Sequence, residues 1–297
     1  MDHARLISSL SKDERRALTQ KSDLRGLAHL AGHLGLLAFG ALWIAFAWPL
    51  WWLLLVPYGV ALVFLFTLEH EATHKTPFAT PWLNTAAGHM AGLMLLLPFR
   101  WFHYFHMAHH RHTNDPDRDP ELAGPKPDTW PAFAVHVSGL PYWWTMAKVL
   151  WENASGAQPE AYVAKRAEPE IRREARAYLA VYALAGLSLL VSPMVLWLWV
   201  VPALLGQPFL RLYLLAEHGR CPPVANMLEN SRTTFTNRAV RFLAWNMPYH
   251  AEHHAYPAVP FHQLPAFHEH AKTHLRTTSD GYVAFVDEYV DDLAKVG

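Results

Sequence analysis

The sequence predicts an all-α integral membrane protein whose four transmembrane helices form two hairpins. Two long runs contain no Asp, Glu, Lys or Arg, residues 26–68 and residues 177–210. Uncharged runs of this length are typical of membrane spans, and each is long enough for a hairpin of two helices. Three histidine clusters also follow apolar stretches of the chain. The fold is therefore expected to place histidine-rich helix ends beside the membrane.

The composition excludes several classes of function. The chain has 25 basic and 25 acidic side chains, so its charge gives no reason to expect a nucleic-acid partner. Its single cysteine, Cys221, excludes an internal disulfide and any all-cysteine zinc or iron–sulfur site. The first residues, MDHARLISSLSKDERR, are charged and polar, and we expect no cleaved signal peptide there.

The first uncharged run predicts helices near residues 27–47 and 52–70. Pro49 marks the turn between them, and tryptophans on both sides of it are typical of a membrane interface. Arg25 and Lys75 flank the two ends of the hairpin, which indicates that both ends face the cytoplasm.

The middle of the chain is expected to stay on that side of the membrane. Residues 82–99 are apolar but marginal in length. A crossing there would put the first and second histidine clusters on opposite faces, so we interpret this stretch as a buried, re-entrant or interfacial helix. Residues 126–176 mix tryptophans with charges and predict amphipathic helices along the membrane surface.

The second uncharged run predicts another hairpin, with short spans, that returns near Arg211. Residues 219–297 resemble a soluble protein and end in an amphipathic helix at about 279–295. Because no long linker interrupts the chain, we expect a single domain over residues 1–297.

The three histidine clusters have spacings of three and four residues, which place side chains on one face of a helix. Imidazole is a good ligand for iron, zinc, copper and nickel. Eight ligands at one location are too many for one four-coordinate zinc but suit two metals. The clusters are His70 and His74, then His106, His109 and His110, then His250, His253 and His254.

Other polar residues are weaker candidates for the same site. His218 follows the fourth predicted span and is either a further ligand or an ordinary interface residue. Asn246 lies four residues before His250, on the same helical face, and could hold a metal-bound water or cap a helix. Asp119 and Glu217 could hydrogen-bond the free nitrogen of a ligand histidine. Further acidic candidates for that role, which could equally form a solvated acidic loop, are Asp115, Asp117, Glu71 and Glu252.

Two other functions are compatible with parts of this pattern. Residues 70–74 read HEATH, which is also the HExxH motif of zinc proteases, with Glu71 as general base. Such a protease needs only a third ligand and leaves two clusters unexplained. A metal transporter would place its ligands near the middle of the spans, whereas these lie at one end.

The motifs HxxxH, HxxHH and HxxHH, in this order and with two flanking hairpins, resemble the three histidine boxes of the membrane fatty acid desaturase/hydroxylase superfamily. The resemblance covers roughly residues 35–265. It implies four transmembrane helices under a cytosolic cap, a non-haem centre of two iron ions, and a ligand histidine between the second and third boxes, to which His218 is similar in position. The implied ligands are His70, His74, His106, His109, His110, His218, His250, His253 and His254.

The resemblance also implies the chemistry. Members use O2 and external electrons to desaturate or hydroxylate an unactivated C–H position of a lipid or fatty acyl chain, and related enzymes act on carotenoids. No side chain supplies such an oxidant, whereas oxygen activated on iron does. We see no fused cytochrome or ferredoxin segment, so a separate donor of ferredoxin, rubredoxin or cytochrome type is expected. The expected location is a bacterial inner membrane, with the active site on its cytoplasmic side.

Overall fold

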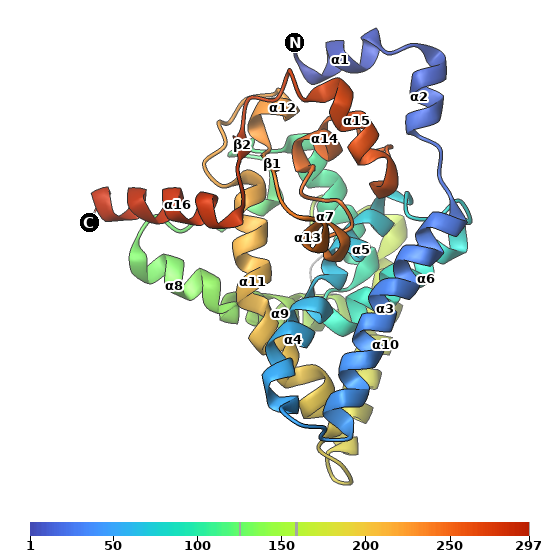
Figure 1. Cartoon of the computed structure of the whole chain (residues 1–297). Helices are drawn as coiled ribbons and strands as arrows, with labels where there is room; N and C mark the ends of the chain where they lie inside the picture. The colour runs from blue at the N-terminus through green and yellow to red at the C-terminus, as the bar shows by residue number, and fades with distance from the viewer. Residues whose placement is uncertain (125, 158–159, 297) are drawn as a thin grey trace.

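The computed structural model describes residues 1–124, 126–157 and 160–296, and its regular structure is almost entirely helical. The exception is a small parallel pair of strands, β1 (Thr233–Thr234) and β2 (Thr278–Ser279). The prediction of an all-α protein is therefore confirmed apart from this pair. Figure 1 shows a broad cap that narrows to an apex, where the turns of two helical hairpins lie.

The first hairpin agrees with the sequence. α3 (Asp23–Ala45) begins at Ser22, whose side chain accepts a hydrogen bond from the amide of Arg25. After a turn the chain returns through η1 (Trp51–Leu54), α4 (Leu55–Val63) and α5 (Leu65–His74). The first histidine cluster therefore lies in the last turns of the returning arm.

The second hairpin consists of α10 (Glu168–Ser188), the π-helical turn η4 (Leu196–Val200) and α11 (Val201–His218). Three stretches are long and apolar enough to cross a membrane: Lys12–Ala45, Trp51–His74 and Leu196–His218. α10 is not among them, because its first half carries acidic and basic side chains and only its second half is uncharged. Three of the four expected spans thus have a helical stretch of membrane length.

Most of the apolar stretch at 82–99 forms one helix, and the chain turns back after it. α6 (Pro81–Leu95) begins beside α3, where the amide and hydroxyl of Thr80 donate to the carboxylate of Asp23 at 2.9 and 2.7 Å. Near its other end, the indole of Trp199 donates to the carbonyl of Met94 at 2.7 Å. α7 (Phe99–His112) then returns and brings the second histidine cluster to the first.

The cap covers the returning ends of α5, α7 and α11 (Figure 1). It ends in α16 (Tyr282–Val296), which confirms the expected C-terminal amphipathic helix. The other cap elements are α1 (His3–Ser9), α2 (Lys12–Leu18), η2 (Pro120–Leu122), α12 (Met227–Asn230), α13 (Arg238–Leu243), α14 (His250–Ala255), η5 (Phe261–Gln263) and α15 (Leu264–Ala271).

Surface helices were expected over residues 126–176, and the chain forms α8 (Trp130–Ser138), α9 (Leu140–Ser155) and η3 (Lys165–Ala167) there. Residues 158–159 of that stretch lie outside the described ranges. On α8 and α9 the exposed tryptophans are Trp130, Trp144 and Trp151. Exposed tryptophans on short amphipathic helices are typical of a membrane interface.

Large apolar side chains are exposed along the hairpins toward the apex. Such an exposed apolar surface is costly in water and typical of contact with lipid. The most exposed of these residues include Phe39, Leu42, Phe46, Leu50, Trp52, Leu184, Leu187, Leu190 and Val191. One buried core runs from Leu6 in the cap to side chains of both hairpins and on to Ala271.

Candidate metal centre

Four helix ends meet beneath the cap and bring together all nine histidines that the sequence identified. These histidines form two groups, described below. The contributing helices are α5 with His70 and His74, α7 with His106, His109 and His110, α11 with His218, and α14 with His250, His253 and His254.

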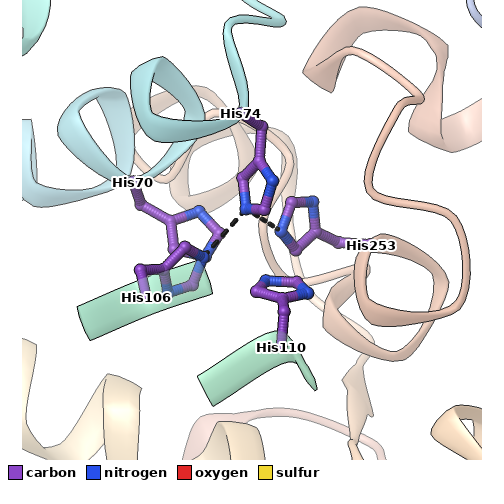
Figure 2. Close-up of side chains that lie close together, drawn as sticks. All are labelled: His70, His74, His106, His110 and His253. Carbon is purple, nitrogen blue, oxygen red and sulfur yellow. Dashed lines mark hydrogen bonds between the residues drawn. The ribbon is translucent and has the colours of Figure 1, made fainter. Parts of the chain in front are cut away.

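The first group contains His70, His74, His106, His110 and His253, whose ligand nitrogens all lie within 4.8 Å of one another. Figure 2 shows their rings converging from three helices. The Nε2 atom of His74 lies 2.9 Å from that of His106 and 3.2 Å from that of His253. Imidazole nitrogens facing one another in this way can share a metal ion.

The second group contains His109, His218 and His254, also with ligand nitrogens within 4.8 Å. His250 joins it, because its Nε2 atom lies 2.9 Å from that of His218. The Nε2 atom of His109 lies 3.2 Å from that of His218 on the other side. This group is fully buried, whereas His74 and His110 in the first group are partly accessible.

The two groups are in direct contact. The rings of His110 and His254, one from each group, stack with centroids 4.0 Å apart and an angle of 6° between their planes. His110 follows His109 directly on α7, so this helix supplies neighbouring residues to different groups. The arrangement can therefore hold two metal ions side by side.

Burial keeps most of these imidazoles neutral. It lowers the pKa of the ligand histidines on α14 and of two on α7 well below the usual value, and the neighbouring imidazoles lower it further. Neutral imidazole is the form that binds metals. These residues are His106, His110, His250, His253 and His254.

His109 differs because acidic groups stand behind it. Burial lowers its pKa, but the nearby carboxylate of Glu121 and the hydrogen bond to Asp119 outweigh burial and raise the pKa. The Nδ1 atom of His109 lies 2.9 Å from Oδ1 of buried Asp119. A carboxylate there fixes the ring so that Nε2 faces a metal and makes it more basic.

Several other ligand histidines also have an oxygen behind the ring. Nδ1 of His250 lies 3.3 Å from a carboxylate oxygen of Glu217 but makes no hydrogen bond within the described ranges, so the supporting role of Glu217 stays a prediction. Nδ1 of His218 lies 3.2 Å from the carbonyl of Asn230. Such contacts leave Nε2 free to coordinate.

Some ring nitrogens have no partner at all. Both nitrogens of His70 and of His110, and Nε2 of His254, are buried and unpaired within the described ranges. A buried polar atom without a partner costs about 1–3 kcal/mol. Metal ions between these rings would satisfy the atoms that face them, so the donor set fits two metals with imidazole ligands.

Asn246 and His250 do not share a helical face, although their spacing suggested it, because α14 begins only at His250. That Asn246 holds a metal-bound water or caps a helix stays a prediction. Asn246 lies in the preceding turn with a positive φ of 59°, and its amide donates to the carbonyl of Phe261 at 3.0 Å. The residue shapes the turn that leads into α14.

Of the other acidic candidates, only Glu71 lies next to a ligand. Its Oε1 atom is 3.7 Å from Nδ1 of His253, while Oε2 accepts hydrogen bonds from the Thr76 hydroxyl and the Phe261 amide, both at 3.0 Å. Glu252 instead binds Thr233 and His268.

The remaining two candidates lie in the loop after α7, and their side chains do not contact the nine clustered histidines. Asp115 binds Arg118 and the amide of Asp117, and Asp117 is exposed.

These contacts speak against a zinc protease. A general base must reach a water bound to the metal. Glu71 instead faces the backbone behind His253, where two donors occupy one of its oxygens. His70 and His74 meet three further histidines, whereas a protease site uses one more ligand and leaves a position open.

Sequence analysis did not identify the hydrogen bonds to the backbone that support the second group. Asn114 has a positive φ of 57°. Its side-chain amide donates to the carbonyl of Asn230 at 2.6 Å, and its backbone amide donates to the carboxylate of Asp119 at 2.8 Å. The ammonium of Lys126 donates to the carbonyl of His218 at 2.7 Å. An asparagine that follows a helix end, as Asn114 follows α7, is the only hint, since asparagine tolerates positive φ.

We expect Asp119→Asn to lower the metal affinity of the protein by about 10–100-fold. Asp119 accepts from His109, from the Asn114 amide and from the Glu121 amide, and the NH2 group of asparagine cannot accept from any of them. Metal content after titration with a chelator measures the effect. Asp115→Asn is the matched control, because Asp115 lies in the same loop without contacting the histidines, and it should leave retention unchanged. Equal retention in both variants would contradict the role of Asp119.

Comparison with known proteins adds a family. The family model described as fatty acid desaturase matches residues 46–285, a range that includes all nine histidines. An sn-1 oleoyl-lipid 12-desaturase of Synechocystis sp. is 25% identical over 278 residues, covering 84% of this chain and 76% of that protein.

Two further relatives match over shorter stretches. An sn-1 oleoyl-lipid 12-desaturase of Picosynechococcus sp. is 31% identical over 132 residues, covering 43% of this chain and 36% of that protein. An sn-1 acyl-lipid omega-3 desaturase (ferredoxin) of Nostoc sp. is 30% identical over 77 residues, which are 26% of this chain and 20% of that protein. These alignments therefore span only a minor part of the two relatives.

Proposed function

Because this chain belongs to the fatty acid desaturase family, we propose that it is a membrane oxidoreductase that introduces a double bond into an acyl chain of a lipid. The observation that carries the proposal is the pair of adjacent histidine groups at the ends of membrane-length helices. Each turnover would remove two hydrogen atoms from the substrate and reduce one O2 to two waters, with two electrons and two protons from outside. The relatives named above are acyl-lipid desaturases, which favours desaturation over hydroxylation.

The proposed cofactors are two iron ions, held by the nine histidines. Bound iron would supply the activation of O2, which no protein side chain can supply. The neutral histidines offer their lone pairs, while Asp119, Glu217 and the carbonyl of Asn230 hold the rings by their other nitrogen. This shell differs from the glutamate-rich shell of soluble di-iron bundles.

The phenylalanines one helical turn before His70 and His106 are suited to exclude water. The ring of Phe66 lies 6.2 Å from that of His70, and the ring of Phe102 lies 5.4 Å from that of His106. The two phenylalanines also contact each other, with centroids 5.6 Å apart. An apolar wall beside the metals would seat a hydrocarbon chain and prevent side reactions with water.

The proposed setting is a bacterial inner membrane with the cap in the cytoplasm, where one domain works with a separate small electron-transfer protein. Basic residues at the ends of the first hairpin, Arg25 and Lys75, support this orientation. We also propose that α10 completes a fourth span beside α11, since both lead to the same turn at the apex. A ferredoxin is named for one relative, which supports a donor of that kind.

The proposal is tested by mass spectrometry of lipids from cells that do or do not express the protein. We expect acyl chains lighter by two hydrogen atoms, and no such product from a His253→Ala variant. Acyl chains heavier by one oxygen atom would instead indicate a hydroxylase. If apolar pigments change and acyl lipids do not, the substrate is of carotenoid type and the proposal is wrong.

A further inference from the structure

Two polar side chains on α11, Gln207 and Arg211, carry buried atoms that have no hydrogen-bond partner in the described part of the chain. Gln207 is fully buried, and neither atom of its amide makes a hydrogen bond within the described ranges. The Nε atom of Arg211 is also buried and unpaired. Because the residues are four positions apart, their side chains lie on one face of the helix. Burying a polar donor without a partner is costly, and a bound acceptor would satisfy the donors of this pair.

The surface helices α8 and α9 enclose this pair. Gly139, at their junction, has a φ of 71°, and a Cβ atom there would lie 2.3 Å from Cγ of Gln207. The guanidinium of Arg211 lies over the ring of Tyr142 from α9, 4.5 Å from its centre. The imidazole of His136 from α8 contacts the backbone of Arg211, and its Nε2 atom is unpaired too. Three helices thus converge on one set of unsatisfied polar atoms.

In the ranges that the structure describes, the guanidinium of Arg211 forms no ion pair at contact distance. The carboxylates of Glu121 and Glu217 attract it from further away, and its direct contact is the ring of Tyr142. Glu217, one and a half turns further along α11, lies against His250 instead. A guanidinium and an amide NH2 group are both donors, so the missing partner is a group with oxygen acceptors, such as a phosphate or a carbonyl.

The pair lies within a membrane-length stretch, on the side of α11 that packs against α8 and α9. Arg211 precedes the ligand His218 by seven residues, which is about 10 Å along a helix. α8 packs against α11 beside this segment, below the cap (Figure 1). The exposed tryptophans of α8 and α9, Trp130, Trp144 and Trp151, mark the membrane interface. Phosphate and ester groups of membrane lipids lie in the interfacial region that such tryptophans mark.

We propose that Gln207 and Arg211 bind an oxygen-rich polar group of the substrate lipid, its ester carbonyl or its phosphate, and so position the acyl chain for the metal site. The inference rests on the proposed function and deepens it by naming the residues that hold the polar part of the substrate. A wholly apolar hydrocarbon would lack the group that they bind. Gln207 and Arg211 would set substrate affinity without contacting the reacting carbons.

The test measures the thermal unfolding midpoint of the full-length, metal-loaded protein in detergent, with and without added lipid. The variants Gln207→Met and Arg211→Met keep side-chain length and remove the donors. Dioleoyl phosphatidylcholine offers both groups, methyl oleate only the ester, the ether-linked dioleyl phosphatidylcholine only the phosphate, and squalene neither. We expect the diester lipid to raise the midpoint of the unaltered protein by about 5 °C, and of either variant by less than about 1 °C.

The single-group lipids identify the source of the oxygen. Stabilisation by methyl oleate points to the ester carbonyl, and stabilisation by the ether lipid points to the phosphate. If squalene stabilises as well as the lipids, or if both variants respond as the unaltered protein does, the proposal is overturned and waters satisfy these side chains. Leu205→Met, on the exposed face of α11, is the control and should keep the full response.

Two further measurements keep the test decisive if a methionine variant folds poorly. Arg211→Lys keeps the positive charge, so an intermediate lipid response is expected even if Arg211→Met folds poorly. In a lipid desaturation assay, the methionine variants should show KM raised about tenfold and kcat changed by less than about twofold, because the lost contacts bind substrate and transition state equally. A lipid response without desaturation would refute the proposed function alone, whereas desaturation without a response that depends on these residues would refute this site alone.

Discussion

His218→Ala is expected to reduce the bound metal from two ions per chain to one and to lower the desaturation rate by at least about a thousandfold. His218 lies between two other members of its group, with Nε2 atoms of His109 and His250 at 3.2 and 2.9 Å. Without His218, the rings of His109, His250 and His254 no longer surround a common point at which a metal ion would bind. Loss of one metal's contribution of several kcal/mol corresponds to a rate effect of that size. Metal analysis of the purified protein and a lipid assay measure the two effects.

A second ligand variant separates the two groups. His253→Ala should empty the first group in the same way, since Nε2 of His253 lies 3.2 Å from that of His74. His112→Ala is the matched control, because His112 follows the second cluster on α7 but belongs to neither group. It should keep both ions and full activity. Two ions per chain in His218→Ala, or metal loss in His112→Ala, would show that the assignment of ligands is wrong.

The sequence predicted the histidines well because their positions depend on local geometry. Spacings of three and four residues align side chains on any helix, and the hairpin lengths decide at which end of the membrane each cluster lies. The helical class and the meeting of the histidines therefore follow largely from periodicity and hydropathy, whereas their role as ligands stays a prediction.

Contacts between distant segments could not be predicted in the same way. The carbonyl of Asn230 behind His218, and the carboxylate of Glu71 behind His253, depend on how α12 and α14 pack in the cap. Asn246 shows the opposite error, since a helical spacing to His250 suggested a shared face where the chain forms a turn. Helix boundaries depend on tertiary contacts as well as on local sequence.

The span that was not confirmed has a similar cause. The uncharged run at residues 177–210 was long enough for two helices, but the turn takes residues from its middle and α10 extends back into the charged segment before it. Hydropathy of the run as a whole does not reveal where the turn falls. The packing of α10 against α7 and α9 decides its length, and these contacts are absent from the sequence pattern.

Gly206→Ala is expected to destabilise the protein strongly, because Gly206 lies where α11 crosses α4 at close range. A Cβ atom on Gly206 would lie 2.3 Å from the backbone of Gly59, and one on Gly59 would lie 2.1 Å from the carbonyl of Pro202. Small residues that let backbones touch are a common basis of helix packing in membranes. Since backbone cannot move aside as a side chain can, the helices must separate, at a cost of at least about 1–3 kcal/mol.

The separation should also disturb the metal centre, since the two helices lead directly to ligands. α4 continues into α5 with His70 and His74, and α11 ends at His218. We expect Gly206→Ala to lower the unfolding midpoint by about 5 °C and to weaken metal retention. Gly186→Ala on α10 is the control, because a Cβ atom there meets nothing within 4 Å, and alanine favours a helix. If both variants behave alike, the close crossing does not hold the two ligand-bearing helices together.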